Sequence, residues 1–176
     1  GFVAGERIVR MEGRGLRPAT GREGAGRMDG MIRPVTDDDI ERLSEWDTVR
    51  FGANRSRVLR ALIRRKPEAA FVCEQGDEIR GFVLARDGRK STQIGPLMAD
   101  DEDLAIVLVE GALAGLQTPS GFSIAIDVLS DQAGFVDYLE SRGIRPTRGF
   151  TRMAKASGLA PGRPGSCFSI GGPELG

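Results

Sequence analysis

Histidine is absent from this 176-residue chain, and its absence restricts the chemistry that the side chains can perform. Without an imidazole base, neither Ser-His nor Cys-His nucleophilic catalysis can be assembled. The two cysteines, Cys73 and Cys167, are too few for a disulfide framework, and without histidine they predict no zinc site. Any chemistry must therefore use carboxylates, Tyr138, lysines or backbone groups, and we expect no metal.

Two polar residues of predicted strands, Asp127 and Arg152, are candidate site residues. Asp127 lies opposite the alternating apolar side chains of its strand, near the carboxyl end, where open sheets with crossover helices bind ligands. It could bind the amine of an acceptor, or it could be a capping or turn aspartate before Ser130. Arg152 could pair with Asp127 across strands or neutralise an anionic ligand, and we favour the pair.

A basic stretch raises the question of nucleic-acid binding. Residues 50–66 contain seven basic residues and no acidic one, and Arg57, Arg60 and Arg64 are spaced for one helical face. No recognised nucleic-acid motif accompanies the stretch, and the chain as a whole has 25 basic and 25 acidic residues. We therefore favour a solvated face or a docking surface, and nucleic acid is not an expected partner.

Hydrophobic periodicity predicts the elements that position these residues. Helices are predicted to begin after Thr36 and at Ser56, Asp100 and Asp131. Strands are predicted at residues 31–35, 69–74, 79–86, 92–99, 121–128, 149–156 and 167–171. The order β-α-α-β-β-β-α-β-α-β-β predicts an α/β (α+β) fold, with an antiparallel meander inside a mixed central sheet flanked by helices.

The beginning of the chain has the composition of a domain boundary. Phe2–Glu12 alternates like a strand but has too little sequence before it to pair with, and residues 14–30 are glycine-rich like a linker. We predict residues 1–13 as the tail of a missing preceding domain, 14–30 as a linker and 31–176 as the domain itself. No apolar run approaches a membrane span of roughly 20 residues, and no signal peptide is evident, so we predict a cytoplasmic protein with no membrane partner.

The element order and four stretches resemble the GCN5-related N-acetyltransferase (GNAT) superfamily, and in particular members with two such domains in tandem. The stretches are Phe51–Ser56 after Asp47, Ile94–Asp101, Phe150–Met153 and Gly171–Gly176. Residues 1–13 resemble the closing strands of the first domain. The resemblance implies a GNAT-like fold and an enzyme that transfers an acetyl or related acyl group from coenzyme A to a small-molecule or peptide amine.

The sequence departs from that pattern where the coenzyme should bind. Catalytic members carry an Arg/Gln-x-x-Gly-x-Gly/Ala loop, whose backbone N–H groups and helix N-terminus hold the pyrophosphate. Here Met98–Asp103 stands in its place, with four carboxylates at the helix start. They satisfy the helix dipole and would repel a pyrophosphate by a few kcal/mol. We therefore expect acetyl-CoA to bind the missing N-terminal domain and expect no cofactor site in this chain.

A second departure concerns the acid that protonates the departing thiolate. Many family members use a tyrosine of the last helix, and aligning Gly143–Ile144 with the family pattern puts Leu139 at that position. Tyr138 is one residue away, about 100° around the helix. We favour a packing role for Tyr138, in a partly exposed position, over the catalytic one.

Asp47, Asn54 and Arg55 flank the break between the first two helices, a region that the resemblance implies shapes the acceptor pocket. They either contact substrate or form an ion pair that packs the loop. We predict an acyl-CoA-dependent N-acyltransferase in which this domain, inactive alone, contributes an acceptor pocket or an interface to the preceding domain or in a homo-oligomer. The alternative is a non-catalytic GNAT-like domain that binds a small ligand or a partner. An upstream Arg/Gln-x-x-Gly-x-Gly/Ala loop would favour the enzyme.

Overall fold

The computed structural model describes residues 1–14, 16–17, 32–116, 123–155, 162–163 and 165–175. Its centre is one eight-stranded sheet in the order β2-β3-β4-β5-β8-β6-β1-β7, in which β5 also pairs with β6. The strands are β1 (Phe2–Arg14), β2 (Ile32–Pro34), β3 (Phe71–Gln75), β4 (Glu78–Asp87), β5 (Thr92–Ala99), β6 (Ser123–Leu129), β7 (Arg145–Lys155) and β8 (Cys167–Ile170).

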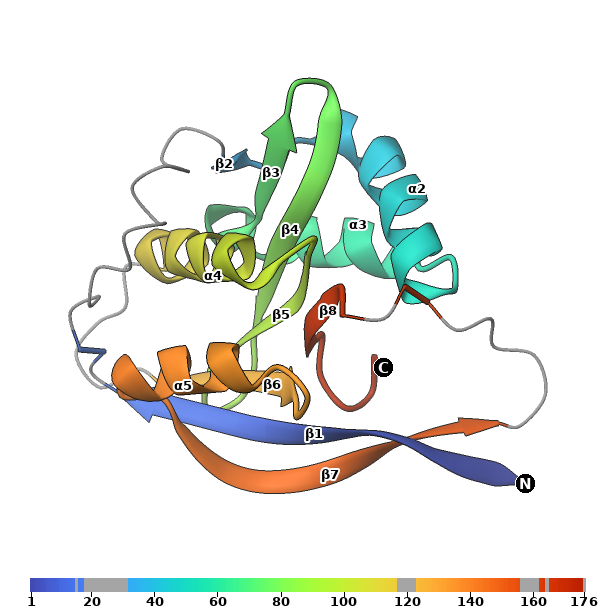
Figure 1. Ribbon diagram of the computed structural model, residues 1–176. Helices are drawn as coiled ribbons and strands as arrows, with labels where there is room; N and C mark the ends of the chain where they lie inside the picture. The colour runs from blue at the N-terminus through green and yellow to red at the C-terminus, as the bar shows by residue number, and fades with distance from the viewer. Residues whose placement is uncertain (15, 18–31, 117–122, 156–161, 164, 176) are drawn as a thin grey trace.

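Helices cover both faces of this sheet (Figure 1). The α-helices of the described residues are α2 (Ile40–Phe51), α3 (Ser56–Arg65), α4 (Glu102–Gly115) and α5 (Ala133–Ser141), and short 3-10 turns precede α2 (Asp37–Asp39) and β3 (Pro67–Ala69). Side chains of α4 and α5 share one core cluster with β5 and β6. Those of α2 and α3 pack against Val72, Phe82 and Met98 on the other face. The domain therefore has three layers.

Local sequence signals explain where the helices begin and end. The Asp39 carboxylate accepts the backbone N–H of Thr36 at 2.8 Å, which caps the turn leading into α2. Gly52 ends α2 with a left-handed φ of 88°, a conformation that glycine adopts without steric cost. The apolar residues that nearly encircle α4 predict burial, and eight residues of this helix are buried.

The strand connections confirm the predicted mixed sheet. β3, β4 and β5 form an antiparallel meander, and β5, α4 and β6 form a crossover unit whose strands pair in parallel, Thr92–Ile94 with Ile124–Ile126. The predicted order of helices and strands holds from β2 to β8. The fold is therefore the α/β class predicted from the sequence.

β1 has a position that the sequence did not predict. It pairs antiparallel with β6 from Ile8 to Arg14 and with β7 from Phe2 to Glu12, and Ile8 and Met11 are buried. The strand that seemed to have nothing to pair with thus lies inside this sheet. Its assignment to a preceding domain and that of residues 14–30 to a linker stay predictions, and residues 15 and 18–31 lie outside the described part.

β7 begins four residues before its predicted start at Gly149, at Arg145. The reason is its partner, because Arg145 is opposite Glu12 of β1 and the ladder extends the strand into a sequence with weak alternation. The predicted end at Ala156, the start of β6 at residues 121–122 and most of the loop at residues 158–165 lie outside the described residues.

Candidate functional site

Open sheets with crossover helices bind ligands in the crevice at the carboxyl ends of their parallel strands. In this chain β5 and β6 pair directly only from Thr92 to Ile94, and farther along β8 lies between them. β8 is antiparallel to both neighbours, with Ser169 opposite Leu97 and Val128. The chain's own strand thus occupies the crevice where a ligand is expected.

The segment around β8 uses backbone groups that a ligand would otherwise contact. The N–H of Ala99 donates to the carbonyl oxygen of Ser166 at 2.9 Å, and Met98 is opposite Cys167 in the ladder. Gly95, with φ of 140°, approaches Ile170 so closely that a Cβ would collide with its carbonyl oxygen. Because buried backbone groups need partners and these have them within the chain, the end of β5 is closed to a ligand.

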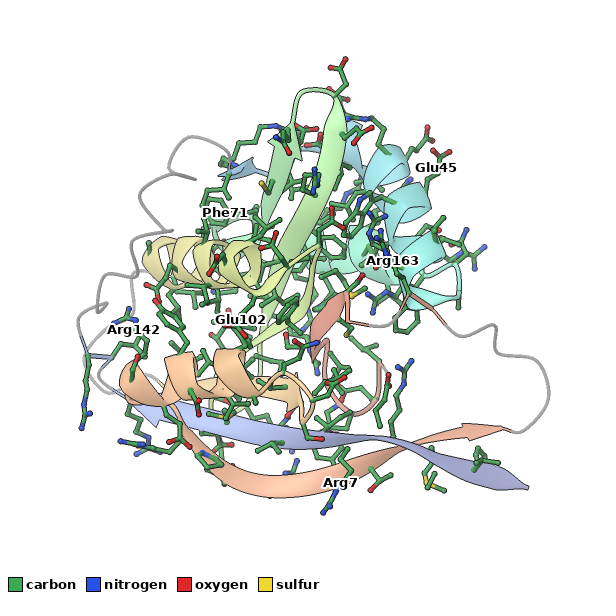
Figure 2. All side chains as sticks on the ribbon, viewed as in Figure 1. Arg7, Glu45, Phe71, Glu102, Arg142 and Arg163 are labelled. Atoms are coloured by element: carbon green, nitrogen blue, oxygen red, sulfur yellow. The ribbon has the colours of Figure 1, made fainter. Side chains whose placement is uncertain are left out.

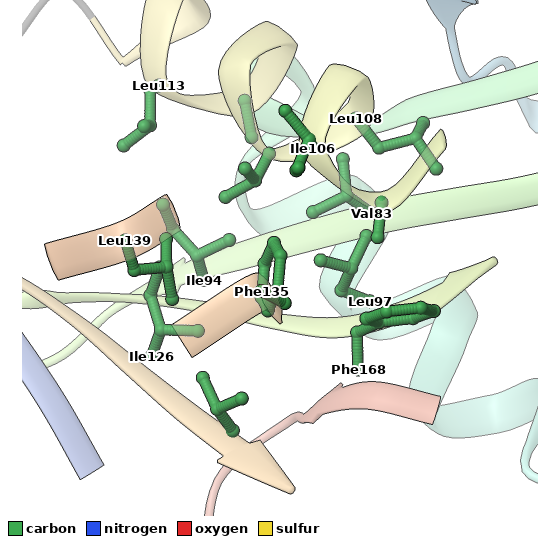
Figure 3. Packing of buried hydrophobic residues seen from close by; sticks show 14 of the residues in the cluster. Val83, Ile94, Leu97, Ile106, Leu108, Leu113, Ile126, Phe135, Leu139 and Phe168 are labelled. Carbon is green, nitrogen blue, oxygen red and sulfur yellow. The ribbon is translucent and has the colours of Figure 1, made fainter. Parts of the chain in front are cut away.

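The hydrophobic core anchors β8. The ring of Phe168 is 2% exposed and packs edge-to-face on Phe135 of α5, with the ring centroids 5.5 Å apart (Figure 3). After β8, Arg86 donates to the carbonyl oxygen of Gly171 and pairs with Glu174. β8 is therefore an integral part of the domain.

The N-terminus of α4 stands where the family resemblance implies a pyrophosphate site. Asp101 caps the helix by accepting the N–H of Leu104 at 2.8 Å. Asp100 pairs with Arg50 at 3.0 Å and with Arg80 at 2.6 Å. Two guanidinium groups thus compensate one of the four carboxylates, and the repulsion is weaker than the sequence indicates. Steric closure by β8 is the stronger obstacle.

Glu102, another of these carboxylates, extends from α4 toward the start of α5 (Figure 2). It lies against Gly134, where a Cβ would collide with both carboxylate oxygens. The absence of a side chain at Gly134 therefore lets the carboxylate approach the positive end of the α5 dipole.

Asp127 is fully buried and makes a bidentate ion pair with Arg10. Nε and Nη2 of Arg10 donate to its two carboxylate oxygens at 2.7 and 2.8 Å, and Nη2 also donates to Oε1 of Gln93 at 3.1 Å. The pKa of Arg10 is raised, mainly by the hydrogen bond to Asp127. The favoured pairing of Asp127 with Arg152 is wrong, because Arg152 pairs with Glu6, 3.0 Å away. Asp127 links β6 to β1 and is neither a cap nor a free site carboxylate.

Asp47 and Arg55 form the ion pair that the sequence offered as one alternative. The two side chains are buried and bidentate, with N–O distances of 2.7 and 2.8 Å. The Arg55 guanidinium also lies over the Phe51 ring, 3.7 Å from its centroid. The Asn54 side chain accepts the backbone N–H of Ser56 at 3.0 Å. These contacts order the break between α2 and α3.

Tyr138 is buried rather than partly exposed, and its hydroxyl donates to Glu110 of α4 at 2.9 Å. Glu110 also accepts two hydrogen bonds from Arg142. Burial, followed by the negative charge of Glu110, raises the pKa of Tyr138. The Tyr138 hydroxyl is hydrogen-bonded to a carboxylate between two helices. This contact fits the packing role that we favoured from the sequence.

The comparisons with known proteins agree with this fold. Residues 43–169 match the family model described as an acetyltransferase (GNAT) domain. The chain belongs to the acetyltransferase (GNAT) domain family. A putative acetyltransferase from Pyrococcus horikoshii superimposes with a TM-score of 0.67 at 25% identity, and the match covers 99% of this chain and 53% of that one.

Two relatives carry names that indicate acyl transfer. The uncharacterized N-acetyltransferase YitH of Bacillus subtilis (strain 168) is 26% identical over 117 residues, which are 66% of this chain and 40% of that protein. The holothin acyltransferase of Pseudoalteromonas sp. (strain SANK 73390) is 27% identical over 112 residues, 64% of this chain and 37% of that protein. The matched part of the chain thus spans about two fifths of these relatives.

The two cysteines of this GNAT domain both have raised thiol pKa values. Cys73 is buried, and burial raises the pKa of its thiol. Burial also raises the pKa of Cys167 to about 12. In the part of the chain that the structure describes, no group of three His, Cys, Asp or Glu side chains could bind a metal ion. No helix of that part is long and apolar enough to cross a membrane.

Sequence reasoning missed two residues that define this region, Arg10 and Glu110. Arg10 was assigned to the tail of another domain, and its partner Asp127 is 117 positions away. Glu110 lies three positions from Val107 and Leu113 on a helix that is apolar nearly all round, and only this one charge beyond the first turn indicated a polar partner.

Proposed function

We propose that this chain is the C-terminal domain of an acyl-CoA-dependent N-acyltransferase with two acetyltransferase-like domains, and that acetyl-CoA binds the preceding domain. Membership of the GNAT family and the names of two relatives support acyl transfer. The proposed acceptor is a small-molecule or peptide amine. One relative is named a holothin acyltransferase, which supports acyl rather than only acetyl transfer.

The position of β8 between β5 and β6 carries this proposal. β8 uses the backbone groups of the crevice and Phe168 is part of the core, which supports a donor site outside this domain. The cap by Asp101 supports the same division of labour, since its carboxylate already accepts an N–H of the first turn of α4. The donor site therefore belongs to the rest of the protein.

The reaction needs a base to deprotonate the ammonium, a donor N–H for the thioester carbonyl and an acid for the thiolate. Asp47, Asp127 and Tyr138 are each committed to a partner inside this domain. We therefore place the base and the acid in the preceding domain. This domain contributes a wall of the acceptor pocket or an interface, and of these the internal pairing of its carboxylates favours the interface.

The test is a calorimetric titration with acetyl-CoA of the 176-residue chain and of the natural protein extended upstream to its start codon. We expect binding by the longer protein and no measurable heat from the shorter chain. Micromolar binding by the shorter chain would show that the domain is itself a donor site. Competent folding of the shorter chain is checked by its cooperative urea unfolding, because a disordered chain would also give no heat.

The alternative is a non-catalytic GNAT-like domain that binds a small ligand or a partner. The internal pairing of Asp47 and Asp127 favours it, because neither carboxylate is available as a base. Transfer of radiolabelled acetyl groups to a panel of amines separates the two functions. Turnover by the longer protein supports the enzyme, and binding without turnover of any amine supports the alternative.

A further inference from the structure

The first half of β1 extends beyond the sheet as a two-stranded ribbon. β6 pairs with β1 only from Ile8 onward, whereas Phe2–Ala4 pairs with Met153–Lys155 of β7 alone. A register shift between Ala4 and Arg7 separates this ribbon from the regular ladder. In Figure 1 the ribbon extends past the other strands, with the N-terminus at its free end.

The ribbon carries three of the four large apolar side chains that are exposed among the described residues. Phe2 is 72% exposed, Val3 56% and Met153 52%, and the remaining large apolar side chain of this kind is Val49 on α2. Because side chains alternate along a strand, Phe2 and Met153 lie on one face and Val3 on the other. Two-stranded ribbons are marginally stable in water, so one with apolar side chains on both faces needs a partner.

The two edges of the ribbon differ in how they resist pairing. The outer edge of β7 carries Arg152 within the ribbon and Arg145, Pro146 and Arg148 farther along the strand, residue types that protect an exposed strand from another sheet. The free edge of β1 has one charged residue from Phe2 to Glu6, and Glu6 is neutralised by Arg152. The edge of β1 is therefore the one suited to accept a strand.

A hollow of about 310 Å³ lies at the base of the ribbon, where β1 separates from β6. It is lined by Arg7, Ser130, Phe150 and Thr151, among others, and the N–H of Ser130 donates to the carbonyl oxygen of Arg7 at 2.9 Å. A strand added to the free edge would pass beside this hollow, which has room for a side chain.

We infer that this ribbon, Phe2–Glu6 with Thr151–Lys155, is the docking edge for the preceding acetyltransferase-like domain, which adds a strand to β1 and covers Phe2, Val3 and Met153. The inference rests on the proposed function. The matched relatives have more than half of their length outside the region shared with this chain, enough for such a domain. In this arrangement one strand belongs to two sheets and transmits the position of one domain to the other.

Hydrogen–deuterium exchange of the full-length natural protein and of the 176-residue chain tests the inference. We expect the amides of Phe2–Glu6 to exchange roughly 100-fold more slowly in the full-length protein, because strand addition engages the free edge. In both proteins the amides from Ile8 to Glu12 should be equally protected, since β6 and β7 flank them. Equal, rapid exchange of Phe2–Glu6 in both would overturn the inference.

Substitutions test the apolar part of the contact. In the full-length protein F2S with M153S should speed exchange of Phe2–Glu6 by roughly tenfold or more, whereas V49S should leave it unchanged. Val49 is the matched control, because it is also 72% exposed but lies on α2. Unchanged exchange in the double variant would overturn the assignment of these side chains to the contact.

The result is separable from that of the acetyl-CoA titration. If the full-length protein binds acetyl-CoA but its Phe2–Glu6 amides exchange rapidly, the docking edge is rejected and the proposed function is kept. If these amides are protected but acetyl-CoA does not bind, the docking edge is kept and the proposed function is rejected. Protection in the shorter chain that grows with its concentration would identify a second copy as the partner and overturn the inference.

Discussion

Replacing Arg10 by Met removes the ionic partner of a fully buried carboxylate and tests the link between β1 and the rest of the sheet. Asp127 is 0% exposed and receives two hydrogen bonds from Arg10, at 2.7 and 2.8 Å. Breaking a buried ion pair by removing one partner costs about 3–5 kcal/mol, because the remaining charge is left without compensation. We expect R10M to lower the free energy of unfolding by that amount at pH 7.

The pair also predicts how other variants behave. D127N should cost less than R10M, because Arg10 is 18% exposed and can be solvated when its partner loses charge. R10M with D127L replaces both members by apolar groups and should recover much of the loss, giving strong non-additivity in a double-mutant cycle.

Urea unfolding followed by fluorescence measures these changes, since Trp46 is the single tryptophan and packs on Phe82 in the core. The matched control is R152M, which breaks the partly exposed pair with Glu6 and should cost less than about 1 kcal/mol. A loss below about 1 kcal/mol for R10M, or additive effects in the cycle, would refute the reasoning that a buried charge is left uncompensated.

Three further substitutions test other parts of the domain. G95A should lower the free energy of unfolding by about 1–3 kcal/mol, because the φ of 140° and the approach of β8 both exclude a Cβ, as urea unfolding will show. Y138F should cost about 1 kcal/mol through its lost bond to Glu110, but should leave acetyl transfer by the full-length protein within about twofold. D39N should cost about 1 kcal/mol at pH 6 and less at pH 2, because Arg33 holds the pKa of Asp39 below its ordinary value.

For Asp39 the depressed pKa means that its stabilisation is present above the unfolded value of roughly 3.9 and is lost as the pH falls through the folded pKa. A difference between wild type and D39N that grows on acidification would contradict this sign. A stable G95A protein would show that β8 can withdraw from β5. If Y138F loses most of its rate of acetyl transfer while its stability is unchanged, Tyr138 has a catalytic role rather than a packing role.

Much of the fold was predictable because its signals are local. The alternation of Ile124, Ile126 and Val128 predicted β6, and the apolar residues around α4 predicted its burial. Turn-forming residues between β3, β4 and β5 predicted the meander, and strand-helix-strand order predicted the parallel pair. Each single helix or strand in these units was predicted from a pattern within the element itself, the range over which periodicity carries information.

The candidate site was less predictable, since its contacts join distant segments. Asp127 was recognised as a carboxylate opposite the apolar face of its strand, but nothing near it in sequence indicates Arg10 as its partner. Asp47 and Arg55 are eight positions apart, and here the sequence did offer the ion pair that the structure contains. The two ion pairs differ in the length of chain between their partners. A local sequence pattern can indicate a contact only when the two residues are close in sequence.

The sequence by itself determined the secondary structure, the GNAT resemblance and the lack of an imidazole base, because composition and periodicity are properties of short segments. Only the tertiary structure decided that β1 completes the sheet between β6 and β7 and that β8 enters between β5 and β6. The two faces of a strand and the backbone groups at its edges are much the same whichever strand lies beside it. The sequence of a strand therefore does not determine which strand it pairs with. The partner is chosen when the whole core is packed, and in this domain that choice closes the crevice.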